Sequence, residues 1–189
     1  LEADEVLKGI TKHSVSKAQQ PNGFIVRSVF NAYSKALESK DIEWKDGLAY
    51  LKRMEQLLKQ MESIHDRAHV GREGKDKNES TIVTASNVLL RSYIKAMEIS
   101  SADCKYLVQK AEDMLQMRSK DSHCAPADSY TYTQMMILLA KSKLPNASEK
   151  ALQILEQIRN NADIKLDSYF FNSALKALTA NPGFEVHCE

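Results

Sequence analysis

The sequence is poor in the two residue types that interrupt helices. Only 6 of its 189 residues are glycine and 4 are proline. Tight turns between short strands depend on these residues, so their scarcity argues against an all-β fold and favours long helices. The longest uninterrupted apolar run, residues 135–140, is far shorter than the roughly 20 residues that a helix needs to cross a bilayer. We therefore expect no membrane insertion.

Paired cysteines and nucleotide-binding loops are also missing. Cys104, Cys124 and Cys188 lie far apart and form no CxxC pair, which is typical of a reducing compartment. His65 and His69 have the spacing of two metal ligands on a helix, but no third ligand accompanies them. There is no GxxxxGK[ST], GxGxxG or GxSxG motif. We expect no enzyme activity, no cofactor, no metal and no small-molecule substrate.

A strong charge of either sign is absent. The chain has 26 Lys and Arg against 25 Asp and Glu, a net charge of +1. Nucleic-acid-binding domains are usually basic, so binding of that kind would require a local cationic patch rather than a global field.

What the sequence does have is helical periodicity. Val26, Val29, Phe30 and Tyr33, for example, follow the i, i+3, i+4, i+7 pattern of one helix face. The predicted helices span residues 3–17, 24–37, 46–64, 82–98, 102–118, 129–142, 147–160 and 168–180. No segment alternates strictly between apolar and polar residues beside hairpin turn signals, so no sheet is predicted. Residues 65–80 are polar and charged, and we expect an exposed loop there.

The predicted helices alternate between two types. One type carries aromatic and small residues, as in FIVRSVFNAYSKA and YTYTQMMILLAKS, whereas the other is charged and amphipathic, as in MEQLLKQME and ALQILEQIRN. Such alternation is typical of helical hairpins that stack into a solenoid. We therefore predict an all-α fold, a right-handed solenoid of antiparallel helix pairs.

Helices of the first type share a common register. They align on Lys35, Lys95 and Lys141. This alignment gives each helix an equivalent start residue: Asn22, Ile82, Asp128 and Asp167.

One segment carries a more specific pattern. Residues 128–159 combine the start residue Asp128, the Thr131-Tyr132 pair and Lys141 at the end of the first helix. This segment resembles a pentatricopeptide (PPR) repeat. The segments TASNVLLRSYIKA and NGFIVRSVFNAYSKA resemble weaker copies, with long insertions similar to those of algal organelle PPR proteins. The rival is a tetratricopeptide array, which has the same hairpin, but its Trp…Leu-Gly…Tyr pattern is missing.

The resemblance divides the chain into a single repeat array, which we interpret as a piece of a longer protein. Residues 1–20 resemble the second helix of a preceding repeat, and residues 167–189 resemble the first helix of a following one. Between them lie a repeat with insertions at residues 21–81 and further repeats at residues 82–127 and 128–166.

PPR proteins bind single-stranded RNA, with one base per repeat, and the resemblance implies the residues involved. Short polar side chains can pair with the exposed edge of an unstacked base, and side chains of neighbouring repeats can sandwich it. The implied base-reading residues are Asn87, Asp128, Thr133, Asp167 and Asn172. The implied base-sandwiching residues are Phe24, Val83, Tyr130 and Tyr169.

Two base-reading pairs follow from the family pattern. Asn87 with Asp128 favours uracil in that family, and Thr133 with Asp167 favours guanine. The plainer alternative is that Asp128 and Asp167 are helix N-caps, worth about 1 kcal/mol each, and that Asn87 and Thr133 are polar residues on a solvated face.

Aromatic residues cluster at the starts of the predicted helices. Among them, we expect Tyr132 and Phe171 to be core packing residues rather than ligand contacts.

Two functions remain open. The first is an RNA-binding PPR module of organelle RNA metabolism or translation, located in a mitochondrion or plastid as the resemblance implies. The second is an adaptor that holds protein subunits in a large organellar complex. The intact reader pairs favour the first. The near-neutral charge favours the second, as do Arg27 and Ile82, which replace the expected readers of the first repeat. A cationic inner face would favour RNA.

Overall fold

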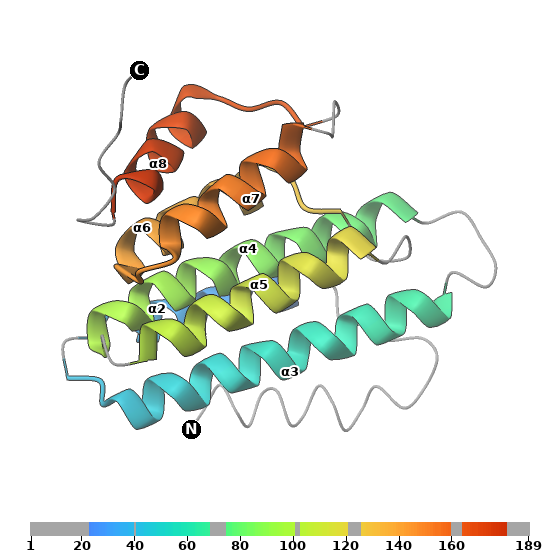
Figure 1. The fold of residues 1–189 in the computed structure, drawn as a ribbon. Helices are drawn as coiled ribbons and strands as arrows, with labels where there is room; N and C mark the ends of the chain where they lie inside the picture. The colour runs from blue at the N-terminus through green and yellow to red at the C-terminus, as the bar shows by residue number, and fades with distance from the viewer. Residues whose placement is uncertain are drawn as a thin grey trace, which may run out of the picture.

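The computed structural model describes residues 23–39, 41–68, 75–100, 103–120, 126–159 and 164–180, and these residues form helices and no strand (Figure 1). The described helices are α2 (Gly23–Ala36), α3 (Trp44–Ala68), α4 (Lys75–Ile99), α5 (Cys104–Lys120), α6 (Ser129–Ser142), α7 (Ala147–Arg159) and α8 (Ser168–Leu178). The predicted all-α class is confirmed. The helix predicted at residues 3–17 lies outside the described residues.

Helices α3 and α4 are longer than the sequence pattern predicts. The expected loop at residues 65–80 is wrong at both ends, because α3 continues to Ala68 and α4 already begins at Lys75. The polar residues there interrupt the apolar periodicity, but the added turns include arginine and alanine in α3 and lysine and glutamate in α4, which are good helix formers. Helix α4 therefore crosses the repeat boundary predicted between residues 81 and 82.

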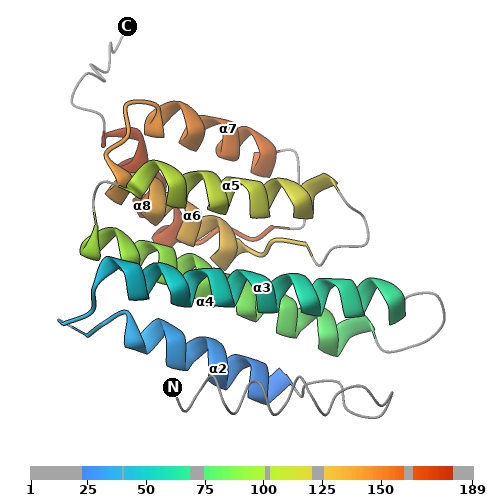
Figure 2. The same cartoon turned by 90° about the horizontal axis from the view of Figure 1, so that it is seen from below.

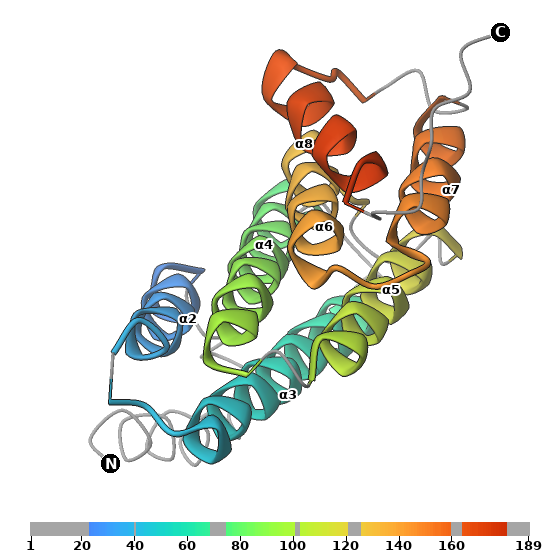
Figure 3. The same cartoon turned by 60° about the vertical axis from the view of Figure 1, so that its left-hand side comes forward.

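The helices form two layers. Helices α2, α4, α6 and α8 contact one another in chain order, and we call them the A row. Helices α3, α5 and α7 form the B row beside them, and each contacts the A-row helices before and after it in the chain (Figure 3). The order in space thus follows the order in the sequence, from α2 and α3 to α7 and α8 (Figures 1 and 2).

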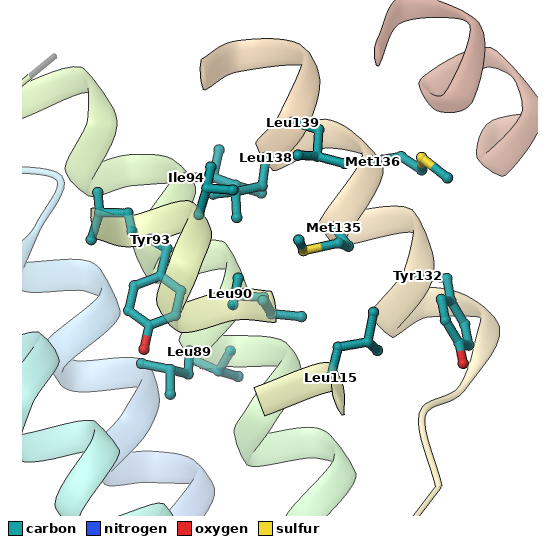
Figure 4. Packing of buried hydrophobic residues seen from close by; sticks show 14 of the residues in the cluster. Leu89, Leu90, Tyr93, Ile94, Leu115, Tyr132, Met135, Met136, Leu138 and Leu139 are labelled. Atoms are coloured by element: carbon teal, nitrogen blue, oxygen red, sulfur yellow. The ribbon is translucent and has the colours of Figure 1, made fainter. Parts of the chain in front are cut away.

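Side chains from both rows build one core. Figure 4 shows the junction of α4 and α6, where Leu90 and Ile94 point towards Met135 and Leu138. All four are at most 8% exposed. Burying a side chain of this size contributes about 1.5–3 kcal/mol, so this junction fixes how the two helices sit together.

Helix α6 lies in the middle of the molecule. It contacts α4, α5, α7 and α8. Its buried residues are Thr131, Tyr132, Thr133, Gln134, Met135, Met136, Leu138, Leu139 and Ser142. A helix covered on several sides is not expected to be strongly amphipathic, which explains the apolar run at residues 135–140.

The two aromatic residues expected in the core have different environments. Tyr132 is 7% exposed, as predicted, whereas Phe171 is 51% exposed, so its predicted core position is wrong. Among the described residues, α8 packs mainly against α6 and α7, and its far side has no neighbouring helix.

Candidate nucleic-acid interface

Asn87 and Asp128 lie 41 residues apart in sequence and are directly hydrogen-bonded. The Asn87 Nδ2 donates to the two carboxylate oxygens of Asp128, at 3.2 and 3.4 Å. Thr131 Oγ1 lies 2.7 Å from Asn87 Oδ1 and 2.6 Å from Asp128 Oδ1, and donates its one hydroxyl hydrogen to either acceptor. The structure therefore brings this predicted pair together and adds Thr131, a partner that the sequence did not assign.

Asp128 also caps α6. The Thr131 backbone N–H donates to Asp128 Oδ1 at 2.7 Å, and the Asp128 N–H donates to Thr131 Oγ1 at 3.3 Å, which completes a capping box. Asp128 is therefore the N-cap that the plainer alternative predicts, and the cap fixes its carboxylate where it meets Asn87.

The second predicted pair, Thr133 with Asp167, is not joined by any hydrogen bond in the part of the chain that the structure describes. Thr133 donates its hydroxyl to the Ser129 carbonyl oxygen at 2.8 Å, which leaves it only as an acceptor. Asp167 accepts the Phe170 N–H at 2.8 Å and is the N-cap of α8. The implied reader Asn172 is exposed on the same helix.

The plainer alternative for Asn87 and Thr133, that they are polar residues on a solvated face, is wrong. Asn87 is 8% exposed and Thr133 is 4% exposed. Asn87 is covered where α4 meets the start of α6, and residue spacing along one helix does not reveal such packing.

The structure describes the side chains of three of the four implied base-sandwiching residues. Tyr130 and Tyr169 both lie two residues after a start residue and are 43% and 58% exposed. Val83 is half-buried and lies only one residue after its start residue, so Thr84 holds the equivalent place in α4. The side chain of Phe24 lies outside the described residues.

Basic residues line the same side of the A row. They lie five, nine or thirteen residues after the start residues, a spacing that puts them on one helix face. We call Arg27, Lys35, Arg91, Lys95, Lys141 and Lys176 the cationic stripe; Lys95 is half-buried and the others are exposed. Sequence reasoning missed the stripe because the net charge of the chain is only +1. A lysine lies thirteen residues after three of the four start residues, and this recurrence is the signal in the sequence that could have revealed the stripe.

Two lysines of the stripe bind carboxylates at, or just beyond, the C-terminal end of the preceding A-row helix. Lys95 Nζ lies 2.5 Å from Glu38 Oε1, and Lys141 Nζ lies 2.6 Å from Glu98 Oε1. Glu38 lies three residues after Lys35, and Glu98 lies three residues after Lys95. The α2–α4 and α4–α6 contacts therefore repeat in the same register. Hydrogen bonding and the charge of Lys95 lower the pKa of Glu38. The six cations of the stripe outnumber the two glutamates that they bind and the exposed start aspartates Asp128 and Asp167 beside them, which leaves this side of the A row net positive.

A groove of about 190 Å³ lies between α3 and α5, on the other side of the molecule. At this groove, Tyr93 donates its hydroxyl to Glu55 Oε1 at 2.8 Å. Burial and the charge of Glu55 raise the pKa of Tyr93, so the phenol stays protonated. The charged residues that line it carry both signs: Glu55, Lys59, Glu62, Lys110 and Asp113. This mixture does not define a site for one class of charged ligand.

Comparisons with known proteins do not assign a family. No protein-family model, curated protein or solved structure matches this chain. In the described ranges, no group of three or more His, Cys, Asp or Glu side chains is placed to hold a metal ion. None of the helices described above is long and apolar enough to cross a membrane.

The two start aspartates offer a matched test of the Asn87–Asp128 contact. Asp167→Ala removes a helix cap and is expected to lower the free energy of unfolding by about 1 kcal/mol. Asp128→Ala also leaves the buried Asn87 amide without its acceptor, which is expected to cost about 1–3 kcal/mol more. Urea unfolding, monitored by circular dichroism, measures both losses in the free energy of unfolding. Equal losses would show that the contact with Asn87 contributes nothing.

Proposed function

We propose that this chain is a PPR-type module that binds single-stranded RNA along its A row and acts in organelle RNA metabolism or translation. The observation that carries the proposal is the cationic stripe, which runs along α2, α4, α6 and α8 and passes the implied base readers of the last three helices. Contacts with phosphate groups supply most of the affinity of a protein for single-stranded nucleic acid. An RNA-binding surface therefore needs basic residues along the path of the RNA backbone.

The helix arrangement supports a repeat array. Helices of the two types alternate between the A row and the B row, and neighbours in sequence are neighbours in space. The Lys95–Glu38 and Lys141–Glu98 ion pairs recur at the same register. We propose on this basis that the rows are part of a right-handed solenoid of helix pairs, in which each pair contacts only its neighbours.

In this proposal, Asp128 and Thr131 are positioning residues for Asn87. Their hydrogen bonds hold the Asn87 amide in one orientation, so it presents a fixed donor and acceptor edge. The exposed rings of Tyr130 and Tyr169 provide surfaces on which bases stack, each worth about 1–3 kcal/mol.

The burial of the readers sets how selective the binding is. Only 8% of Asn87 and 4% of Thr133 are exposed, so a base reaches only the edge of each side chain. Phosphate contacts and stacking do not depend on base identity. We therefore expect binding that tolerates many sequences, with a modest base preference.

Electrophoretic shifts with short U- and G-containing RNA oligonucleotides test the proposal. Affinity is expected to fall steeply as salt rises. Asn87→Ala is expected to reduce the preference for U-containing RNA, and Thr133→Ala the preference for G-containing RNA, each by about threefold to tenfold. Gln153→Ala, at an exposed amide side chain of α7 in the B row, is the control. Unchanged preference in both variants would refute base reading, and no binding at low salt would refute RNA binding.

A second candidate function is an adaptor for protein subunits of a large organellar complex. It is favoured by the exposed apolar side chains of Phe171 and Leu175, which are 51% and 60% exposed on α8. An adaptor would show no RNA shift at low salt, and its binding to protein partners would depend on these two side chains.

A further inference from the structure

Each A-row helix presents equivalent positions to the helix that follows it. These positions lie four and eight residues after the start residue, and we call them the forward face. They are Val26 and Phe30 in α2, Ser86 and Leu90 in α4, and Tyr132 and Met136 in α6, all at most 8% exposed. Figure 4 shows Leu90 directed from α4 towards α6, and Met136 directed from α6 towards α8. In α8 the same positions are Phe171 and Leu175, and both are more than half exposed.

The opposite side of each helix receives the forward face of its predecessor. We call the positions six and ten residues after the start residue the backward face. They are Val88 and Ser92 in α4, Gln134 and Leu138 in α6, and Ser173 and Ala177 in α8, all at most 7% exposed. In α2 these positions are Ser28 and Ala32, and both are exposed.

The two open faces match each other chemically. In the contact between α6 and α8, an aromatic and a long apolar side chain, Tyr132 and Met136, face α8, whose backward face is a serine and an alanine. The open forward face of α8 carries the same combination, Phe171 with Leu175. The open backward face of α2 also carries a serine and an alanine, Ser28 and Ala32.

We propose that copies of this chain associate head to tail, with α8 of one copy packed on α2 of the next. This packing continues the A row and repeats the pairing of forward and backward faces that the chain already makes three times. The contact is heterologous, because the two surfaces differ, so each copy keeps one open face after the first contact forms. The proposal does not depend on RNA binding, and its test contains no RNA.

Sedimentation velocity over a wide protein concentration range tests the association, because a contact between two helices is small and is expected to be weak. The mass is expected to rise above the 21.3 kDa of one chain as the concentration rises. Leu175→Glu and Ala32→Glu each place a charge in one face and are expected to keep the protein monomeric. Leu152→Glu changes an apolar residue of α7 that is 44% exposed and lies outside both faces, so association should persist.

Mixing the two monomeric variants gives the decisive result. The Ala32→Glu chain keeps its α8 face and the Leu175→Glu chain keeps its α2 face, so the mixture is expected to form dimers and nothing larger. A wild-type protein that stays monomeric at all concentrations would overturn the proposal. So would association that Leu175→Glu abolishes and Ala32→Glu leaves intact, because α8 would then bind another surface. A mixture that forms no dimers would overturn it as well.

Discussion

Replacing Phe170 with alanine is expected to lower the free energy of unfolding by about 3–5 kcal/mol. The Phe170 side chain is 0% exposed, at the start of α8, and is part of the hydrophobic core. The substitution removes the transfer free energy of the ring and leaves a cavity that its neighbours fill only partly. Since domains are typically stable by about 5–15 kcal/mol, this is a large fraction of the total. Urea unfolding monitored by circular dichroism measures the loss.

The neighbouring phenylalanine is a matched control for this prediction. Phe171 is 51% exposed and meets Phe170 edge to face, with ring centroids 5.5 Å apart. Phe171→Ala is expected to cost about 0.5–1.5 kcal/mol, mainly through the lost ring pair. A loss for Phe171→Ala as large as that for Phe170→Ala would mean that α8 turns a different face to α6.

Local signals predict α6 well and α3 and α4 poorly. The predicted and observed bounds of α6 coincide at residues 129–142, because a capping aspartate and an apolar run both mark this helix in the sequence. The extensions of α3 to Ala68 and of α4 back to Lys75 have no apolar pattern. Only helix propensity acts there, and periodicity is insensitive to it.

In the candidate site too, the sequence predicted some of the residues and missed what depends on packing between helices. The resemblance to PPR repeats suggested Asn87 and Asp128, and the structure places them in contact. The third partner, Thr131, and the burial of Thr133 depend on how α4, α6 and α8 pack. The position of a residue along one helix does not reveal whether a neighbouring helix covers its side chain. For the same reason, the exposure of Phe171 was not predicted.

The two proposals have a joint consequence for the length of the RNA path. If α8 of one copy packs on α2 of the next, Lys176 at one end of the cationic stripe comes next to the α2 residues Arg27 and Lys35 of the following copy. A longer stripe neutralises more phosphates, so affinity should become more dependent on salt once the copies associate. The variants that remain monomeric separate this contribution from the affinity of a single chain.

Reversing two charges of the cationic stripe is expected to weaken RNA binding about 10- to 100-fold at low salt. Arg91 and Lys176 both lie nine residues after a start residue and are exposed on α4 and α8. For single strands, each neutralised phosphate contributes about 0.7 to the slope of log affinity against log salt. The Arg91→Glu, Lys176→Glu double variant is therefore expected to flatten this slope by about 1.4. Fluorescence anisotropy with a labelled oligonucleotide over a series of salt concentrations measures both quantities.

A double variant in the B row separates the stripe from net charge. Lys52 and Lys105 are exposed on α3 and α5, and Lys52→Glu with Lys105→Glu changes the net charge by the same amount. At moderate salt the Debye length is about 10 Å, so charges on the opposite layer are largely screened from RNA on the A row. This control is expected to keep near-wild-type affinity and slope. Equal weakening in the two double variants would mean that binding follows total charge and not the stripe. RNA binding that neither variant weakens would place the contact elsewhere on the molecule.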